Sequence, residues 1–330
     1  MGYLEFYGLE QEPFSNAPVS KFYFNSEQHV QALLRLRRVA DQMKGLAILV
    51  GDVGAGKTTL ARKMLDSLSE DQYEAALLVI IHSGISAHWL LRRIAQQLGV
   101  QNPAEEKLQL LSQLYRRLLQ IADQGRKAVV LIDEAQMLQT RELMEEFRGL
   151  LNLEIPERKL ITFIFFGLPE IEENMKLDPP LLQRVTLKWR LDSMSETSSR
   201  KYVEHRLALA GARKPIFSDG AMDAIYRFSH GIPRLINTIA DNALFEGYIL
   251  KADAIPQEVI ENIAVDLGLS PYRKRELRVV NTIEALEGFD EEPKGFEDAP
   301  DEPTAKQFER EAPNQDQDID AILSGLDDKL

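Results

Sequence analysis

"GLAILVGDVGAGKTTLARKML", residues 45–65, is the stretch that decides how the rest of the chain is interpreted. The aliphatic run at 46–50 fits a buried strand, and residues 59–68 carry apolar side chains at helical spacing. Between them, residues 51–58 follow the pattern G-x-x-x-x-G-K-T. A strand, a glycine-rich loop and a helix in this order form the context that a phosphate-binding loop requires. The stretch therefore predicts a binding site for a nucleoside triphosphate.

The chemistry of such a site explains the residue types in the loop. Glycines let the backbone bend close to the anion, consecutive N–H groups bind phosphate oxygens, and the helix directs its positive end at the charge. We expect Lys57 to reach the β- and γ-phosphates and the Thr58 hydroxyl to ligate Mg²⁺, while Thr59 comes one place too late for the metal. The residues expected to contact the nucleotide are Gly51, Asp52, Val53, Gly54, Ala55, Gly56, Lys57, Thr58 and Thr59.

A second signal lies in "KAVVLIDEAQ", residues 127–136. Four aliphatic residues in a row, 129–132, fit a strand buried on both faces of a parallel sheet. Asp133 and Glu134 follow at the end of the strand, where α/β sheets bind ligands. A plain helix cap would explain an isolated Asp-Glu pair. Beside a phosphate loop, the pair predicts that Asp133 holds the Mg²⁺ shell and that Glu134 polarises the attacking water as a general base.

Strand and helix patterns alternate over the first part of the chain, which predicts an α/β fold with a parallel sheet covered by helices on both faces. After about residue 192 only helical patterns follow, so we expect a nucleotide-binding core at 1–192, a small all-α lid at 193–267 and a linker with an acidic, disordered tail at 268–330. The expected strands cover 46–50, 75–81, 127–132 and 160–167; the expected helices cover 29–43, 59–68, 86–97, 104–122, 141–151, 195–210, 218–230, 235–250 and 256–267.

Charge and composition narrow the function classes. The 330 residues carry a net charge of −13, and we count sixteen acidic against four basic residues from Asn281 onward. The remaining residues hold 36 acids and 35 bases, a balance of −1, which argues neither for nor against nucleic acid. The absence of cysteine excludes disulfides and thiolate sites. With no apolar run of membrane-spanning length and no evident signal peptide, we expect a cytoplasmic protein.

The two ends of the chain have patterns of their own. Residues 1–28 are rich in aromatic residues and prolines, which predicts either a cap over the sheet that lines a purine pocket or ordinary core packing. In "DIDAILSGLDDKL", 318–330, aliphatic residues share one helical face. That face would suit docking to a partner groove, or it is a solvated acidic tail with stray aliphatic residues. The residues on it are Ile319, Ile322, Leu323 and Leu326.

Together these motifs resemble an AAA+ ATPase, and among AAA+ proteins the ExeA/GspA group of secretion ATPases, including the MSHA-pilus relatives. The matching segments are "FYGLEQEPFSNAP", "GDVGAGKTT", "LIDEAQ", "FGLPEI", "LLQRV", "SETSSRKYVEHRLALAG" and "SHGIPRLIN", in the family's order over about residues 3–250. The resemblance implies ATP and Mg²⁺ as cofactors, a homo-oligomeric ring or filament and a protein partner in an envelope machine. The founding members continue into a transmembrane helix and a peptidoglycan-binding domain, whereas this sequence ends in an acidic tail.

The resemblance also implies roles for two arginines. Arg184 in "LLQRV" resembles the arginine that reaches the γ-phosphate of a neighbouring subunit, although a surface ion pair would explain it too. Arg234 in "GIPR" resembles the lid arginine that senses the nucleotide in its own chain. Besides the acidic tail, the sequence departs from the family at the end of the strand expected at 160–167. Leu168 follows Gly167 where a polar sensor is usual, so turnover could be slow.

Three functions compete on the sequence alone. The first is a cytoplasmic ATPase that drives assembly or remodelling of a secretion, pilus or exopolysaccharide-export machine. The second is an ATPase of the transposition-regulator type that oligomerises on duplex DNA, and the third is a nucleotide-gated switch. DNA binding would need basic residues on one face, and solvated helix faces balanced by acidic residues would explain the same arginines without DNA. The candidate arginines are Arg35, Arg37, Arg38, Arg92, Arg93, Arg116 and Arg117.

Overall fold

The computed structural model describes residues 2–16, 20–156 and 158–271, and these residues belong to one compact unit. The expected acidic tail, including the aliphatic face at 319–326, lies outside the described residues. Within them, no helix is long and apolar enough to cross a membrane.

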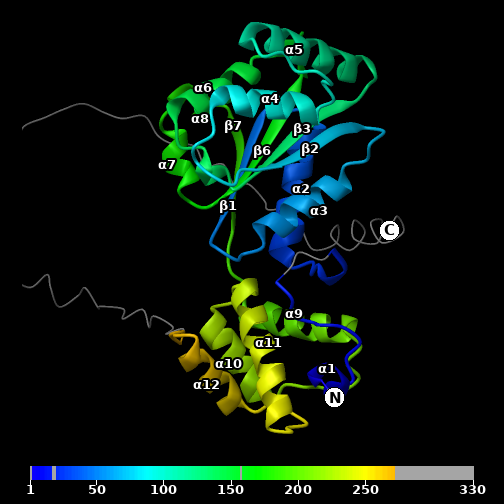
Figure 1. Ribbon diagram of the computed structural model, residues 1–330, viewed down its shortest axis with the longest axis vertical. Coiled ribbons are helices and arrows are strands. Elements are labelled where there is room, and N and C mark those ends of the chain that lie inside the picture. Colours follow the sequence, from blue (N-terminus) through cyan, green and yellow to red (C-terminus); the bar gives the residue numbers. More distant parts are fainter. Residues whose placement is uncertain (1, 17–19, 157, 272–330) are drawn as a thin grey trace, which may run out of the picture. The chain divides into compact units, whose positions relative to one another are not determined.

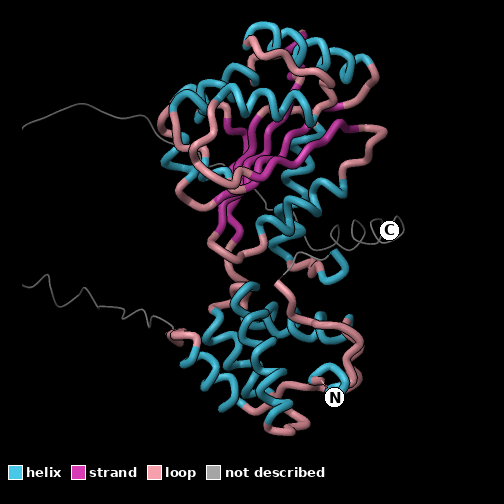
Figure 2. Tube along the Cα trace, in the orientation of Figure 1, coloured by secondary structure: helices cyan, strands magenta, loops and turns pink. Residues whose placement is uncertain are grey.

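The centre of the fold is a five-stranded sheet in the order β2-β3-β6-β1-β7, in which every neighbouring pair is parallel (Figures 1 and 2). This arrangement confirms the expected parallel α/β fold. Because the strands run parallel, their carboxyl ends meet at one edge of the sheet. The strands are β1 (Leu46–Gly51), β2 (Tyr73–Val79), β3 (Lys127–Asp133), β6 (Ile161–Gly167) and β7 (Val185–Leu191), with a separate antiparallel pair, β4 (Glu154–Ile155) and β5 (Arg158–Lys159).

Most of the long helices begin where a side chain accepts a hydrogen bond from the first turn. Ser26, Ser86, Thr140, Ser195 and Ser218 each accept from the N–H three residues later, which satisfies a donor that the helix cannot pair. The helices are α1 (Tyr3–Tyr7), η1 (Ser20–Phe22), α2 (Glu27–Asp41), α3 (Lys57–Ser67), α4 (Ala87–Gln97), α5 (Lys107–Asp123), η2 (Ala135–Met137), α6 (Arg141–Leu150), α7 (Ile171–Met175), α8 (Pro179–Leu182), α9 (Glu196–Leu209), α10 (Asp219–Ser229), α11 (Pro233–Ile249) and α12 (Gln257–Asp266).

Helices cover both faces of the sheet, as the continuous apolar runs predict. Side chains alternate along each strand, so Leu46 and Ile48 of β1 join the core formed with α4, α5 and α6. Ala47 and Leu49 of the same strand join the core formed with α2 and α3. Figure 1 shows α4 and α5 on one side of the sheet and α2 and α3 on the other. Both faces of β1, β3 and β6 are therefore shielded from water, which leaves their carboxyl ends as the place for a ligand.

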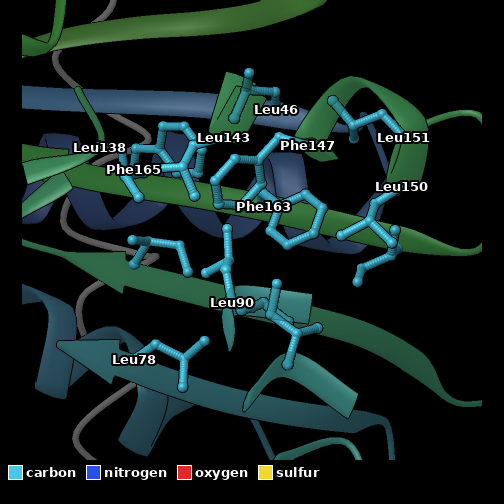
Figure 3. Close-up of a cluster of buried hydrophobic side chains, with 14 of the residues drawn as sticks. Leu46, Leu78, Leu90, Leu138, Leu143, Phe147, Leu150, Leu151, Phe163 and Phe165 are labelled. Atoms are coloured by element: carbon cyan, nitrogen blue, oxygen red, sulfur yellow. The ribbon is translucent and has the colours of Figure 1, made fainter. Parts of the chain in front are cut away.

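Phe147 of α6 fixes that helix on β6. Its ring meets the rings of Phe163 and Phe165 edge-on, at centroid distances of 5.0 and 4.8 Å (Figure 3). All three side chains are fully buried. Such edge-to-face contacts stabilise the packing beyond the area that they bury, so the position of β6, and with it the strand end at Gly167, is well determined.

The N-terminal segment packs on the helices α9–α12, so of the two expected arrangements ordinary core packing is confirmed and the cap over the sheet is wrong. Tyr7, Leu9, Phe14 and Phe22 are buried in the same core as the apolar faces of these helices. The Tyr7 hydroxyl also donates to the carbonyl of Ala252, at 3.2 Å. The physical reason is that other helices already cover both faces of the sheet, so the apolar surface open to these aromatic rings belongs to α9–α12.

Within the five-stranded sheet, one strand escapes the sequence pattern. β7 alternates between half-buried and exposed residues, because it is the edge strand beside β1 and only one side of it faces the core. Charged residues such as Lys188 and Arg190 interrupt its apolar residues, so no continuous apolar run announces it. β2 begins two residues earlier than expected, at Tyr73.

Gly231 closes the turn between α10 and α11 against the segment that leads into α9. Its carbonyl accepts a hydrogen bond from the Met194 N–H, at 2.9 Å, and its φ is +72°. A Cβ at this position would lie 2.0 Å from the Met194 carbonyl oxygen. Only glycine therefore fits here without moving the backbone of the connecting segment.

We expect Gly231→Ala to lower the free energy of unfolding by roughly 3 kcal/mol. The alanine would have to adopt a left-handed backbone conformation, and its Cβ would clash with the Met194 carbonyl oxygen. Urea unfolding followed by circular dichroism measures the change. Gly125→Ala is the matched control, because Gly125 also has a positive φ of +74° but open space around its Cβ position. Equal losses for the two variants would contradict the role of the Met194 contact.

Candidate functional site

The glycine-rich loop joins β1 to α3 as predicted. Gly54 and Gly56 have φ values of +78° and +100°, which ordinary side chains rarely adopt. Gly56 is the residue that precedes α3, so the helix begins at Lys57 and its free N–H groups face the loop. A Cβ on Gly56 would lie 2.9 Å from Nε2 of His29, so the loop also needs glycine for lack of space. The loop conformation follows from these two constraints.

Lys57 places a buried ammonium group at the end of β1. The residue is 7% exposed, and its Nζ donates to the carbonyl oxygens of Gly51 and Asp52, at 2.9 Å each. Burial lowers the pKa of Lys57, and the nearby carboxylates of Glu134 and Asp133 oppose that shift. The ammonium is thus held at the phosphate loop by oxygen acceptors that phosphate oxygens could replace.

Asp133 lies at the end of β3 and is 1% exposed. Its Oδ1 accepts from the Glu134 N–H, at 3.0 Å, whereas its buried Oδ2 has no hydrogen-bond partner among the described residues. Burial raises the pKa of Asp133, and the Thr58 hydroxyl is close enough to oppose the shift. A buried carboxylate oxygen without a partner, next to a hydroxyl, is the kind of oxygen donor set that Mg²⁺ takes together with substrate phosphates. The residues therefore fit the metal.

Glu134 adopts an unusual backbone conformation. Its φ of 56° and ψ of 38° lie in the left-handed region, which costs a residue with a side chain about 1–2 kcal/mol. The turn directs the chain from β3 into η2, and the Glu134 side chain lines the cavity beside the loop. Its Oε2 accepts a hydrogen bond from Nε2 of Gln136, at 2.5 Å.

A cavity of about 360 Å³ joins the loop to α9, α11 and the N-terminal segment. Its lining includes Lys57, Thr58 and Glu134, so the structure brings these predicted residues together. The lining also includes aromatic rings and amides, a composition suited to a flat aromatic base. The further lining residues are Ser15, Asn16, Phe22, Tyr23, Phe24, His29, Val53, Gly54, Gly56, Thr59, Leu168, Met194, Tyr202, Arg206, Pro233, Arg234 and Asn237.

Some predicted residues lie outside this lining. Gly51 and Asp52 take part through their carbonyl groups, which hold Lys57. Ala55, a residue of the loop itself, is buried at 3% exposure. Arg184 follows α8 and does not line the cavity. It donates to the carbonyl oxygen of Arg148, at 3.0 Å, and to Oδ1 of Asn152, at 2.5 Å.

Arg234 meets the phosphate loop directly. It lies in the first turn of α11, and its backbone N–H donates to the Gly54 carbonyl, at 3.3 Å. A Cβ on Gly54 would lie 2.7 Å from the Cβ of Arg234, so the glycine allows this close approach. The Arg234 side chain is exposed and lines the cavity. The helix α11 and the loop are therefore in backbone contact.

Arg206 of α9 is a site residue that the sequence did not predict. It is 5% exposed, and its guanidinium donates to the Ser15 carbonyl, at 3.0 Å, and to the Pro13 carbonyl. It also donates to the Tyr202 hydroxyl, at 2.6 Å, and to Oδ1 of Asn237, at 3.2 Å. The sequence offered one signal for Arg206, which is an arginine at a position of the helical pattern where apolar residues are buried. The acceptors that explain it lie about 190 positions away, at Pro13 and Ser15.

His29 is a second unpredicted neighbour of the loop. Ser26 Oγ lies 2.6 Å from its Nδ1, and burial lowers the pKa of His29 to about 4. The imidazole is therefore neutral at pH 7 and packs against Gly56 without adding charge.

Known proteins resemble the chain both in sequence and in structure. A model of the AAA domain family matches residues 40–175. General secretion pathway protein A of Aeromonas hydrophila is 36% identical over 249 residues, which are 74% of this chain and 45% of that protein. The chain thus spans less than half the length of this curated relative.

Solved structures share the fold at lower identity. The Aeropyrum pernix ORC2 protein superposes with a TM-score of 0.60 at 17% identity, over 83% of this chain and 76% of that one. Aeropyrum pernix ORC1 in complex with DNA gives a TM-score of 0.56 at 16% identity, over 74% and 66% of the two chains. Together with the geometry of the loop, these similarities show that the chain is an AAA-type P-loop ATPase related to general secretion pathway protein A.

Proposed function

We propose that this protein is a cytoplasmic ATPase that binds ATP with Mg²⁺ and uses hydrolysis to drive assembly or remodelling of an envelope machine for secretion, pilus assembly or exopolysaccharide export. The observation that carries the nucleotide part is the convergence of Lys57, Thr58 and Glu134 on one cavity beside the loop. The support for the envelope role is the relationship to general secretion pathway protein A.

In this proposal each residue has a distinct task. Lys57 exchanges the two loop carbonyls for β- and γ-phosphate oxygens. The Thr58 hydroxyl and Oδ2 of Asp133 would hold Mg²⁺, which would supply positive charge against the phosphates. Glu134 accepts a proton from the attacking water, and Arg234 senses the nucleotide from its own chain. The backbone N–H groups of residues 52–58 bind the remaining phosphate oxygens.

We propose that the active form is a homo-oligomer, ring or filament, in which Arg184 acts on the nucleotide of a neighbouring copy. Arg184 lies outside its own cavity, as a residue acting on a neighbour must. Its two bonds to Arg148 and Asn152 would hold the guanidinium in one direction until a neighbour arrives. A protein partner in the envelope machine would then respond to the assembled state.

The DNA-associated alternative receives less support from the surface. Of the candidate arginines, Arg37 donates to the Ser67 carbonyl, Arg92 pairs with Glu105, and Arg117 pairs with Glu74 at 2.7 Å. Arg35 lies over the Trp189 ring, at 4.1 Å. To bind these arginines, the phosphate groups of DNA would have to replace the contacts that the arginines make within the chain.

We expect duplex DNA to leave the steady-state rate of ATP hydrolysis unchanged at low salt, because Arg35, Arg37, Arg92 and Arg117 already have contacts within the chain. The rate is measured with and without DNA over a series of salt concentrations. A marked stimulation that fades as salt rises would favour the DNA-associated function instead, since phosphate contacts weaken with salt.

Two variants test the nucleotide site together. Lys57→Ala removes a charged donor and should weaken ATP binding about 100-fold, the loss typical of charge-assisted hydrogen bonds. Glu134→Gln keeps the shape but cannot accept the proton, so it should bind ATP and lose turnover by about 100-fold or more. Fluorescent ATP-analogue titration measures the binding, and phosphate release measures the turnover.

The matched controls for these variants are Lys44→Ala and Glu142→Gln, both at exposed positions. Each control should retain wild-type binding and turnover. Unchanged ATP affinity in Lys57→Ala would exclude the assigned role of the loop lysine. Undiminished turnover in Glu134→Gln would show that another group is the base.

Mixing inactive subunits tests the role of Arg184. An Arg184→Ala subunit keeps Glu134, and a Glu134→Gln subunit keeps Arg184, so some interfaces in a mixture are complete. In an equal mixture about a quarter of head-to-tail interfaces combine both intact groups. We expect each variant alone to be inactive and the mixture to regain a corresponding part of the wild-type rate. A rate that stays at background in every proportion would contradict a site shared between subunits.

A further inference from the structure

Gln136 connects the end of β6 to the general base. It lies in η2, three residues after Asp133, the last residue of β3. The residue is buried, at 6% exposure. Burial of a primary amide is costly unless its donors and its acceptor are paired. The partners of Gln136 therefore show what its amide is for.

Two hydrogen bonds fix the direction of the amide. Its Oε1 accepts from the Leu168 backbone N–H, at 3.1 Å, and its Nε2 donates to Oε2 of Glu134, at 2.5 Å. A backbone N–H can only donate and an ionised carboxylate can only accept, so the amide cannot be turned around. The Gln136 carbonyl in turn accepts from Nδ2 of Asn174, at 2.9 Å, which holds its backbone on α7.

The strand end leaves room for this arrangement. Gly167 is the last residue of β6, and a Cβ there would lie 3.0 Å from Oε1 of Gln136 and 3.2 Å from its backbone nitrogen. The absence of a side chain at Gly167 therefore lets the amide reach both the Leu168 N–H and the Glu134 carboxylate.

We propose that Gln136 is a positioning residue that orients the Glu134 carboxylate for catalysis, with the Leu168 N–H as its anchor. The bond to Oε2 leaves Oε1 of Glu134 to accept from water. This inference rests on the proposed function of Glu134 as the base. It also explains how the site works with leucine at position 168, where a polar side chain is usual. The Leu168 backbone N–H anchors Gln136, and the Gln136 side chain supplies the polar group.

Orientation of a base acts on the chemical step more than on binding. We therefore expect Gln136→Met, which keeps the length of the side chain but removes both hydrogen bonds, to lower kcat about tenfold and to change KM for ATP less than twofold. Gln124→Met, at an exposed position after α5, is the control and should behave as the wild type.

Gln136→Glu separates the two hydrogen bonds. A glutamate at this position keeps the size and can still accept from the Leu168 N–H, but when ionised it cannot donate to Glu134. We expect it to lose kcat at least as severely as Gln136→Met. Wild-type kcat in Gln136→Glu would show that the residue only packs against the strand end, and would overturn the proposal.

A double-variant cycle distinguishes failure of this proposal from failure of the proposed function. If Gln136 acts through Glu134, then Gln136→Met should cause no further loss of the single-turnover rate in the Glu134→Gln background. A full additional tenfold loss there would overturn the proposal, as would normal kcat in Gln136→Met alone. Undiminished turnover of Glu134→Gln by itself would instead remove the base on which the inference rests. Titration with the fluorescent ATP analogue confirms that each variant still binds nucleotide.

Discussion

The buried ammonium of Lys57 is the constraint around which the nucleotide site is organised. A charge at 7% exposure needs acceptors, and here the carbonyl groups of Gly51 and Asp52 supply them. Those carbonyls are available only because the loop turns back over the strand end, which in turn needs positive φ angles at Gly54 and Gly56. The same turn starts α3 at Lys57 itself, so one backbone conformation places both the lysine and the helix N-terminus at the phosphate position.

The loop is also the point at which the helices α9–α12 meet the sheet. Arg234 of α11 is in backbone contact with Gly54, and Arg206 of α9, which also lines the cavity, donates to the carbonyls of Pro13 and Ser15 in the N-terminal segment. A nucleotide filling this cavity would therefore touch the loop, the helices and the N-terminal segment at once. This arrangement offers a physical route by which ATP binding and hydrolysis could alter the position of α9–α12, since a ligand shifts a conformational equilibrium by its differential contacts.

The sequence predicted those parts of the fold whose signal is local. The aliphatic runs of β1, β3 and β6 are buried on both faces and stand out as continuous stretches, and the helices α9–α12 have bounds within two residues of those expected. β7 was missed, because an edge strand with one exposed side lacks such a run. For the N-terminal segment the sequence left a cap over the sheet and ordinary core packing open, and the structure shows core packing against α9–α12. The competition between two apolar surfaces cannot be read from the segment itself.

The site residues also divide into those with a local sequence signal and those without one. The loop and the pair Asp133 and Glu134 could be predicted because consecutive residues carry the chemistry. Gln136 and Arg206 could not, because their roles depend on Leu168, Pro13 and Ser15, which only folding brings close. A polar residue in a buried pattern marks such positions, but its partner must be found in the structure.

A crystal structure of the Glu134→Gln variant with ATP and Mg²⁺ tests the account of the nucleotide site most directly. The account predicts a triphosphate inside the loop at residues 51–58, with Nζ of Lys57 moved from the carbonyls of Gly51 and Asp52 onto phosphate oxygens and Mg²⁺ beside the Thr58 hydroxyl and Oδ2 of Asp133. A nucleotide bound elsewhere, or a Lys57 that keeps its two carbonyl partners in the ATP complex, would contradict it.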